Sequence, residues 1–226
     1  MAKRARASMP KLHQGFEVLP DVISASELET ISNQLDGIGA VGTRCLLDNS
    51  WCQVLAAKVR DSVSASFLDL AQLVVVQATY FNKTSESNWF VSFHQDRSIP
   101  VADETPMTYR GWSRKEDRTF IQGPDATMAE MLAIRLHIDD SHLENGPLRV
   151  IPGSHRNGTL RQPEIDAIRD RESETTVTAE RGSVIAMKPM LLHASSKSRT
   201  TESRRVVQFL CGPRTLPGEL RWRATY

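Results

Sequence analysis

Hydrophobic residues recur at helical spacing in the first third of the chain. Ser26 and Glu29 have the spacing of a capping box, and the apolar positions that follow continue until Gly37. A second amphipathic run begins near Ser50. The first run places Leu28, Ile31 and Leu35 on one face, and the second places Trp51, Val54, Leu55, Val59 and Val63. This pattern predicts two N-terminal helices that pack against a sheet.

Beyond residue 72 the pattern changes to short runs of β-branched and aromatic residues, separated by turn residues. The runs are QLVVVQATYF, NWFVSFHQD, MLAIRLHIDD, LRVIPG, TTVTAERGSVIAMKP and RRVVQFLCG. Several short strands with turn signals predict an all-β sandwich or barrel, here with the two helices beside it. A chain of 226 residues suits one such domain, so we expect a flexible basic tail over 1–15 and a single domain over 16–226.

Two polar segments interrupt the strand pattern. Residues 97–127 carry several prolines and glycines and form a connection far longer than most loops, which is uncommon unless the loop is functional. We therefore expect a lid or substrate loop there. Residues 156–173 predict another surface excursion with a helical turn. The turn-rich motif NGPLRVIPGSH is expected to be architectural, with His155 capping its turn.

Composition and charge limit the class of protein. The 28 basic and 27 acidic residues give a net charge of +1, which offers no electrostatic case for nucleic acid or a membrane surface as partner. No apolar run approaches the roughly 18 residues of a membrane span, and the basic N-terminus lacks the apolar stretch of a secretory signal. Cys45, Cys52 and Cys211 have no CxxC spacing, which favours a reducing compartment. We expect a cytoplasmic protein with a small-molecule partner, as a monomer or homodimer.

A histidine and an aspartate end one predicted strand, NWFVSFHQD. Residues i and i+2 of a strand project from the same face, so His94 and Asp96 can present an imidazole and a carboxylate to one point while Gln95 faces away. His193 lies 97 residues beyond Asp96, in GSVIAMKPMLLHAS, where Gly182 allows a tight turn into the strand that delivers it. Two histidines and one carboxylate form the facial triad that holds Fe(II) and leaves positions open for a cosubstrate and oxygen.

The spacing alone does not identify the metal site. A second His-x-Asp, formed by His137 and Asp139 in IRLHIDD, satisfies the same geometry. Either pair is also compatible with a polar strand end, whose histidine and aspartate are hydrogen-bonded to the backbone or to each other. The residue types by themselves leave these alternatives open.

Five motifs, taken in order, resemble one known family. They are NWFVSFHQD, AIRLHIDD, NGPLRVIPGSHRNG, RGSVIAMKPMLLHAS and RRVVQFL. Together they resemble the bacterial type of the phytanoyl-CoA dioxygenase family of Fe(II)- and 2-oxoglutarate-dependent oxygenases. The resemblance implies a mainly β fold, a double-stranded β-helix or cupin-like jelly-roll with the metal at one mouth.

The resemblance also implies roles for individual residues. The implied metal ligands are His94, Asp96 and His193. An arginine eleven residues after the distal histidine, here Arg204, would bind the far carboxylate of 2-oxoglutarate. The further implied cosubstrate contacts are Ser195, Trp112 and Asn82. Arg199 and Arg205 are then expected to be solvated charges, and the second His-x-Asp becomes structural. Candidate substrate contacts are Arg97, Arg135 and His137.

The activity implied is oxidation of an unactivated C–H bond of a small molecule, with Fe(II), 2-oxoglutarate and O2. Hydroxylation is the default outcome, and desaturation, cyclisation or rearrangement starts from the same radical. Because Asp96 supplies a carboxylate, halogenation is not expected, and no catalytic residue is assigned beyond the metal ligands. We expect a secondary-metabolite intermediate as substrate; the charges of residues 97–127 indicate either a polar substrate or a solvated lid. The alternative is a jelly-roll protein that senses or binds a metal or ligand without turnover.

Overall fold

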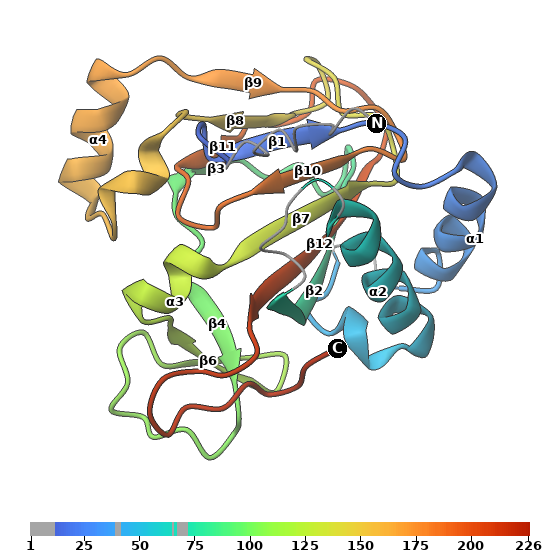
Figure 1. Ribbon diagram of the computed structural model, residues 1–226. Helices are drawn as coiled ribbons and strands as arrows, with labels where there is room; N and C mark the ends of the chain where they lie inside the picture. The colour runs from blue at the N-terminus through green and yellow to red at the C-terminus, as the bar shows by residue number, and fades with distance from the viewer. Residues whose placement is uncertain (1–11, 39–41, 65, 67–71) are drawn as a thin grey trace, which may run out of the picture.

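Two antiparallel sheets face each other across the middle of the molecule, with their inner residues packed in one apolar cluster (Figure 1). The computed structural model describes residues 12–38, 42–64, 66 and 72–226. The larger sheet has the order β1 (Phe16–Leu19), β10 (Val184–Met187), β7 (Leu132–His137), β12 (Arg204–Pro213), β2 (Leu73–Lys83). The smaller has the order β3 (Val91–His94), β11 (His193–Ser195), β8 (Leu148–Val150), β9 (Thr175–Val177). The prediction of a mainly β jelly-roll is confirmed.

Two N-terminal helices, α1 (Ala25–Leu35) and α2 (Ser50–Ser64), cover the outer face of the larger sheet (Figure 1). Helix α1 begins slightly earlier than predicted, because Ser24 and Glu27, not Ser26 and Glu29, form the capping pair. Val54 was expected in the buried stripe of α2 but is 72% exposed. The buried stripe instead runs through Cys52, Leu55, Ala56, Val59 and Val63. No helix in the described parts of the chain is long and apolar enough to cross a membrane.

The smaller sheet is covered on its outer face by α4 (Gln162–Arg171), which forms where the sequence predicted a helical turn. A short 3-10 turn, η3 (Ser154–Asn157), precedes this helix. The prediction that His155 caps the turn is wrong. The Ser154 hydroxyl instead stabilises this region, since it donates to the Ile151 carbonyl at 2.7 Å and accepts from the Leu192 amide at 2.9 Å.

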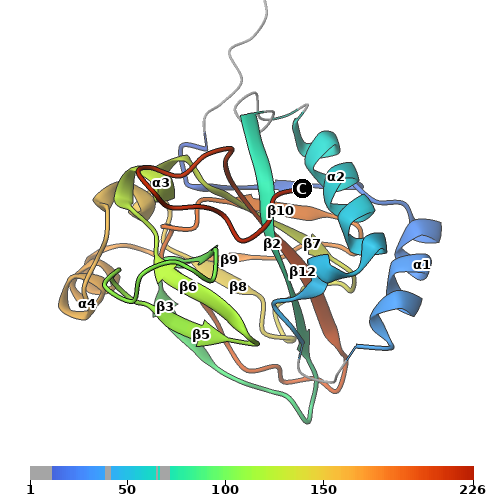
Figure 2. The ribbon, with the colours of Figure 1, turned by 90° about the horizontal axis from the view of Figure 1, so that it is seen from below.

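The segment 97–127 contains regular structure where the sequence predicted a long loop. It forms a third sheet in the order β4 (Ser98–Val101), β6 (Arg118–Gln122), β5 (Ser113–Lys115), and ends in the short helix α3 (Asp125–Glu130). Figure 2 shows β5 and β6 on the side of the molecule away from α1. Glu116 and Asp117 adopt positive φ values of 49° and 56°, which close the tight β5–β6 hairpin. Strands this short, with prolines and glycines around them, were indistinguishable from a loop in the sequence.

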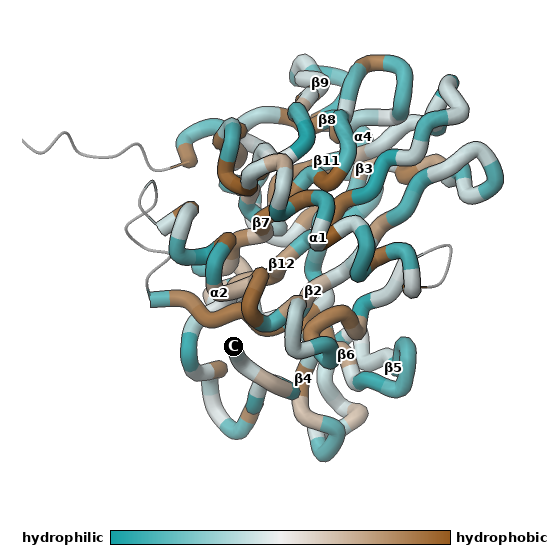
Figure 3. Tube along the Cα trace, turned by 90° about the vertical axis from the view of Figure 1, so that its right-hand side faces the viewer, coloured by the Kyte–Doolittle hydropathy of each residue, from teal (hydrophilic) through white to brown (hydrophobic). Residues whose placement is uncertain are grey.

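Strand β7 lies in the middle of the larger sheet, and all six of its residues are buried. Leu132, Ile134 and Leu136 pack in the cluster that includes both N-terminal helices. Ala133 and Arg135 face the space between the sheets. Hydrophobic positions gather around β12 and β2, while the peripheral loops are mostly hydrophilic (Figure 3). The larger sheet therefore carries an apolar face toward the helices and a partly polar face toward the cavity.

Substitution of Gly182 tests the geometry of the turn that leads into β10. Its φ is +83°, and a Cβ there would lie 2.4 Å from the backbone carbonyl oxygen of Ile23, which is in the loop before α1. We expect Gly182→Ala to cost about 2 kcal/mol of unfolding free energy, or about 4–8 °C in melting temperature for a domain of this size. Gly37→Ala is the control, because nothing lies within 4 Å of its added Cβ. Equal melting temperatures for the two variants would contradict this account of the turn.

Candidate metal centre and cosubstrate pocket

His94, Asp96 and His193 converge at one end of the space between the sheets. His94 ends β3 and lies opposite His193 in the register of β11. One Asp96 carboxylate oxygen lies 3.5 Å from His94 Nε2, and the other lies 3.6 Å from His193 Nε2. The ligand atoms all lie within 4.8 Å of one another, and this is the one such cluster among the described residues. These three residues would hold a divalent ion once their ligand atoms move closer together, because metal–nitrogen and metal–oxygen bonds are about 2.1 Å long.

Each histidine is oriented by its own strand. His94 Nδ1 lies 2.9 Å from the Ser92 carbonyl, and His193 Nδ1 lies 2.8 Å from the Leu191 carbonyl. A carbonyl oxygen only accepts, so each Nδ1 donates its proton to the backbone. In the neutral imidazoles each Nε2 then carries the lone pair, and each lies opposite an Asp96 carboxylate oxygen. The backbone thus selects the tautomer that a metal ion needs.

The electrostatics of the cluster favour the ligand state of His193 and Asp96 but not that of His94. Burial lowers the pKa of His193 to about 4, which keeps this imidazole neutral. Burial also acts to lower the pKa of His94, but its hydrogen bond to Asp96 and the charge of Asp96 raise it above the usual value. For Asp96, burial works toward a higher pKa, yet His193, His94 and Arg135 hold it well below its usual range. The carboxylate is therefore ionised at neutral pH.

Residues next to the ligands hold them in place. Gln95 faces away from the cluster, as predicted, and its amide donates to the Gly158 and Met190 carbonyls at 2.8 and 2.9 Å. The Asp96 amide donates to the Pro189 carbonyl at 2.9 Å. The prediction that the strand after Gly182 delivers His193 is wrong in detail. That strand, β10, stays in the larger sheet, and His193 begins β11 in the smaller sheet after a turn over 188–191.

The second His-x-Asp does not form a cluster. His137 is 1% exposed, and neither ring nitrogen has a hydrogen-bond partner among the described residues. Burial, with Arg135 and Arg204 nearby, lowers its pKa to about 3, so it is neutral. Asp139 instead accepts two hydrogen bonds from the Arg205 guanidinium, at 2.8 and 2.9 Å. Arg205 is thus an ion-pair partner, and the prediction that it is a solvated charge is wrong.

A cavity of about 360 Å³ opens beside the metal cluster. It is lined from both main sheets and from the third sheet, which contributes Ser98 and Phe120. Of the residues predicted to bind cosubstrate or substrate, those that line it are Arg97, Arg135, Ser195 and Arg204. The segment 97–127 therefore forms part of the cavity wall.

Arg204 and Ser195 both line this cavity. Arg204 is 4% exposed, and its Nε has no hydrogen-bond partner among the described residues. Lys83 lies opposite Arg204 in the register of β2 and is fully buried. Its ammonium donates to Ser195 Oγ at 2.8 Å and to the Ser196 carbonyl at 2.6 Å. Burial, together with the charges of Arg204 and Arg135, lowers the pKa of Lys83 to about 8.

Two predicted cosubstrate contacts lie elsewhere. Asn82 is next to Lys83 in β2, so strand alternation turns it to the opposite face, where it lines a separate depression with Tyr80 and Arg205. Trp112 packs beside the apolar cluster that includes Val101 and Ile121, and its indole N–H donates to the Thr105 carbonyl at 3.4 Å. Neither side chain lines the cavity beside the metal cluster. Asn82 and Trp112 are therefore not part of the candidate site.

Several cavity residues were missed in the sequence. They are Arg44, Gln77, Thr79, Phe81, Trp89, Lys115, Phe120 and Gln208, with Lys83 directly behind them. Alternation from Arg204 would have found some of them, because Gln208 lies four residues along β12 on the same face. For Arg44 the sequence holds no comparable signal.

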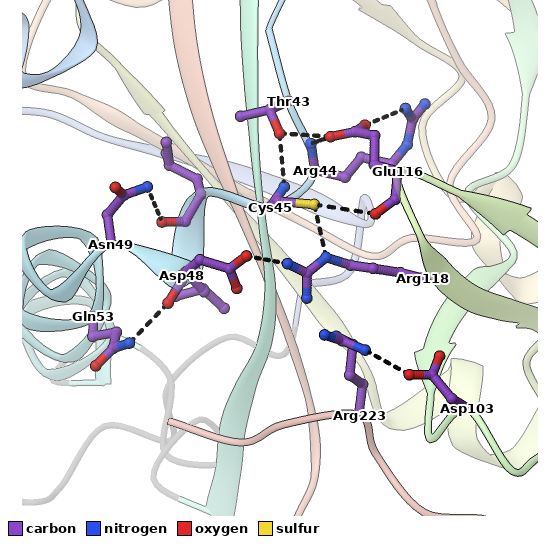
Figure 4. A network of polar contacts seen from close by, with 12 residues as sticks. Thr43, Arg44, Cys45, Asp48, Asn49, Gln53, Asp103, Glu116, Arg118 and Arg223 are labelled. Atoms are coloured by element: carbon purple, nitrogen blue, oxygen red, sulfur yellow. Dashed lines mark hydrogen bonds and ion pairs between the residues drawn. The ribbon is translucent and has the colours of Figure 1, made fainter. Parts of the chain in front are cut away.

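Arg44 is brought to the cavity by a polar network between residues 43–49 and the β5–β6 hairpin (Figure 4). Glu116, in the hairpin turn, accepts hydrogen bonds from the Thr43 hydroxyl at 2.6 Å and from the Arg44 amide at 3.0 Å. Its carboxylate also pairs with the Arg44 guanidinium at 3.2 Å. Arg118 of the same hairpin pairs with Asp48. This network ties the cavity wall formed by segment 97–127 to the N-terminal half.

Solved structures of similar fold include proteins with iron, nickel or 2-oxoglutarate bound. HygX from Streptomyces hygroscopicus with nickel and 2-oxoglutarate bound is 17% identical, with a TM-score of 0.64 over 89% of this chain and 83% of that chain. EctD from S. alaskensis with 2-oxoglutarate and 5-hydroxyectoine is 20% identical, with a TM-score of 0.65 over 89% and 73%. SnoN, a non-heme alpha-ketoglutarate-dependent epimerase from nogalamycin biosynthesis, is 17% identical, with a TM-score of 0.61 over 88% and 78%.

A search of curated proteins found no match. The similarities to solved structures, at these identities, concern the fold. A protein-family comparison is more specific, because the model for phytanoyl-CoA dioxygenase matches residues 12–206, which include all three residues of the metal cluster. The chain therefore belongs to the phytanoyl-CoA dioxygenase family of iron- and 2-oxoglutarate-dependent oxygenases.

Proposed function

We propose that this chain binds Fe(II) through His94, Asp96 and His193 and oxidises a C–H bond of a small organic molecule. The observation that carries the proposal is the convergence of these three side chains beside a cavity that also contains Arg204. Arg204 and Ser195 are the proposed contacts of the distal carboxylate of 2-oxoglutarate. An arginine presents two parallel N–H donors to a carboxylate, and this one is buried without an ion-pair partner within 4.0 Å among the described residues.

Iron with 2-oxoglutarate, when bound, supplies the O2-dependent oxidation. The protein contributes orientation and the exclusion of water. The backbone contacts of Ser92 and Leu191 hold the two imidazoles with Nε2 toward the metal position. Lys83 donates to Ser195 Oγ, so the Ser195 hydroxyl is positioned at the end of the cavity where the distal carboxylate would lie. The buried side chains of Arg135, His193 and Arg204 would limit solvent access on their side of the cavity, while His94 and Asp96 remain partly exposed.

The substrate is proposed to be a small biosynthetic intermediate. In support, HygX has been solved with hygromycin B bound, and EctD has been solved with 5-hydroxyectoine. Both are proteins of the same fold. A cavity of about 360 Å³ lies within the usual range for small-molecule sites.

Succinate formation tests the proposal. Metal-free protein is supplied with Fe(II), ascorbate, 2-oxoglutarate and O2, and we expect succinate above a protein-free control even before the substrate is known. The control variant is His142→Gln, which removes an exposed histidine that is paired with Glu202, away from the cluster. If wild-type protein binds Fe(II) but releases no succinate, even with a broad panel of substrates, the alternative of a non-catalytic metal- or ligand-binding protein is favoured.

Metal affinity should depend on pH through one histidine. Above the raised pKa of His94, all three ligands are already in the metal-binding state, so affinity should be constant. Below that pKa and down to about pH 4, where His193 begins to gain a proton, affinity should fall about tenfold per pH unit, because one proton competes with the metal. Nickel titrations monitored by calorimetry would measure this slope, with His142→Gln as the control. A slope of two would mean that His193 also carries a proton in this range.

A further inference from the structure

The cavity beside the metal cluster is strongly cationic, although the whole chain has a net charge of only +1. Its charged lining residues are Arg44, Arg97, Lys115, Arg135, Arg204 and Asp96. Asp96 is thus the one acidic residue among five basic ones in the lining, and it is a proposed metal ligand. Such a charge distribution attracts anions and disfavours cationic ligands.

Arg135 is a cation of this set that one side chain, Gln208, connects to the proposed metal ligand Asp96. It is 8% exposed, and its guanidinium lies over the Phe81 ring at 5.4 Å from the ring centroid. One Nη donates to Gln208 Oε1, while Nε has no hydrogen-bond partner among the described residues. No ion pair within 4.0 Å involves Arg135 in the part of the chain that the structure describes. A buried guanidinium in this state requires an anionic partner.

Gln208 places Arg135 next to the reaction centre. Its Oε1 accepts from Arg135, and its Nε2 lies 3.4 Å from an Asp96 carboxylate oxygen. The side-chain amide therefore bridges the guanidinium and the metal-binding carboxylate. An anion that binds Arg135 would therefore lie on the side of the cavity that holds the proposed metal ligands.

The charges inside the cavity do not balance when the proposed cofactor and cosubstrate are present. A divalent metal with Asp96, Arg135 and Arg204 leaves an excess of three positive charges, and the dianionic 2-oxoglutarate removes two. Lys83, buried behind Ser195, adds a further cation when it is protonated. At least one positive charge therefore remains for the primary substrate to neutralise.

We propose that Arg135 binds a carboxylate of the primary substrate beside the metal, and that Arg97 and Lys115 at the cavity wall attract this anion. The inference deepens the proposed function and rests on it. A carboxylate suits the site because the guanidinium presents its donors in one plane, with one face covered by Phe81. The same chemistry could be supplied by the carboxylate of 2-oxoglutarate that lies nearest the metal, and the experiment separates these two sources.

The experiment uses full-length protein that is loaded with Mn(II) and saturated with 2-oxoglutarate. Acetate and acetamide are the probes. Mn(II) enhances the relaxation of protons that lie near it, so the methyl signal of a probe in the cavity relaxes faster. We expect the methyl signal of acetate to relax faster in the presence of the protein and that of acetamide to be unchanged. In Arg135→Gln we expect acetate binding to be at least tenfold weaker. Arg135→Lys, which keeps the charge but not the planar donors, should fall between the two. Arg181→Gln removes an exposed charge elsewhere and should match the wild type.

Three results would overturn the inference. The first is an equal effect on the relaxation of acetate and acetamide, or no effect on either. The second is unchanged acetate binding in Arg135→Gln, which would indicate that acetate coordinates the metal directly. The third is a loss of 2-oxoglutarate affinity in Arg135→Gln as large as in Arg204→Ala. The last would assign Arg135 to the cosubstrate. Melting curves of each Mn(II)-loaded variant verify that the protein is folded. If Arg135→Gln does not fold, Arg135→Lys provides the comparison with the wild type. Failure of the proposed function would be distinct, since wild-type protein would then bind neither Mn(II) nor 2-oxoglutarate.

Discussion

Asp96→Ala is expected to weaken Fe(II) binding and to reduce succinate formation by at least about a thousandfold, which corresponds to about 4 kcal/mol of transition-state stabilisation. The reason is geometric. Asp96 contributes both of its oxygens to the contacts with His94 and His193, and it is the one carboxylate in the cluster. Its loss leaves two imidazoles and removes the negative charge that offsets the metal. Iron binding measured by equilibrium dialysis and succinate measured by chromatography test this directly.

Asp139→Ala is the matched control for Asp96→Ala, since it removes the corresponding carboxylate of the second His-x-Asp. Asp139 pairs with Arg205 through two hydrogen bonds and has no contact with the metal cluster. This variant should keep iron binding and turnover but lose about 2 kcal/mol of unfolding free energy, as expected for a charged hydrogen-bonded pair that is partly buried. The reverse pattern, with turnover lost in Asp139→Ala and kept in Asp96→Ala, would transfer the metal to the second motif.

Arg204→Ala is expected to raise the dissociation constant of 2-oxoglutarate by about a hundredfold, close to 3 kcal/mol, because the distal carboxylate would lose its buried partner. The effect should appear in the KM for 2-oxoglutarate more than in kcat, since the contact is remote from the reacting atoms. Calorimetric titration of nickel-loaded protein with 2-oxoglutarate measures the binding term without turnover. Arg204→Lys should recover only part of the affinity, because an ammonium does not reproduce the planar pair of donors.

Arg205→Ala distinguishes this role from a general effect of charge on β12. Arg205 is the next residue and points to the other face, where it contacts Asp139 and Ser32. Its removal should lower the melting temperature and leave the affinity for 2-oxoglutarate unchanged. If both variants weaken 2-oxoglutarate binding equally, the loss reflects damage to the strand, and Arg204 is not the specific contact.

The cationic interior has a physical consequence for the protein without ligands. Burial lowers the pKa of Arg204 to about 10, with Arg135 acting in the same direction, and it lowers the pKa of Lys83 to about 8. These groups are held close together without carboxylate partners, so their mutual repulsion opposes folding. A bound dianion relieves that repulsion. The site is thus electrostatically prepared for its cosubstrate at some expense in the stability of the empty protein.

Local patterns in the sequence predicted most of the regular elements. Apolar residues at intervals of three and four gave both N-terminal helices, and the short β-branched runs gave most strands of the two main sheets. Strand β1 of the larger sheet was not predicted; it has only four residues, Phe16–Leu19. The third sheet was missed because β4 and β5 have only four and three residues and lie among prolines and glycines. Val54 was misplaced because a helix of fifteen residues has room for more than one apolar stripe, and packing decides which is buried.

The candidate site divides in the same way. Strand alternation by itself placed His94 and Asp96 on one face and Gln95 on the other, because the period of two is a property of the backbone. Motif order singled out His193 and Arg204. Motif position or a polar strand face was the reason to assign Asn82, Trp112 and His137 to the cavity. The sequence does not reveal how each strand is rotated or how each loop packs, and the structure places these side chains elsewhere.

What the sequence determined alone is therefore local: the helical and strand periods, the paired presentation of His94 and Asp96, and the family to which the motifs belong. Tertiary structure decided which His-x-Asp meets His193, since that depends on the pairing of β3 with β11 across nearly a hundred residues. It also decided that Lys83, Arg135 and Arg204 share one interior. Side chains distant in the chain become neighbours only when strands pair in register, and no local pattern encodes the register of a distant partner.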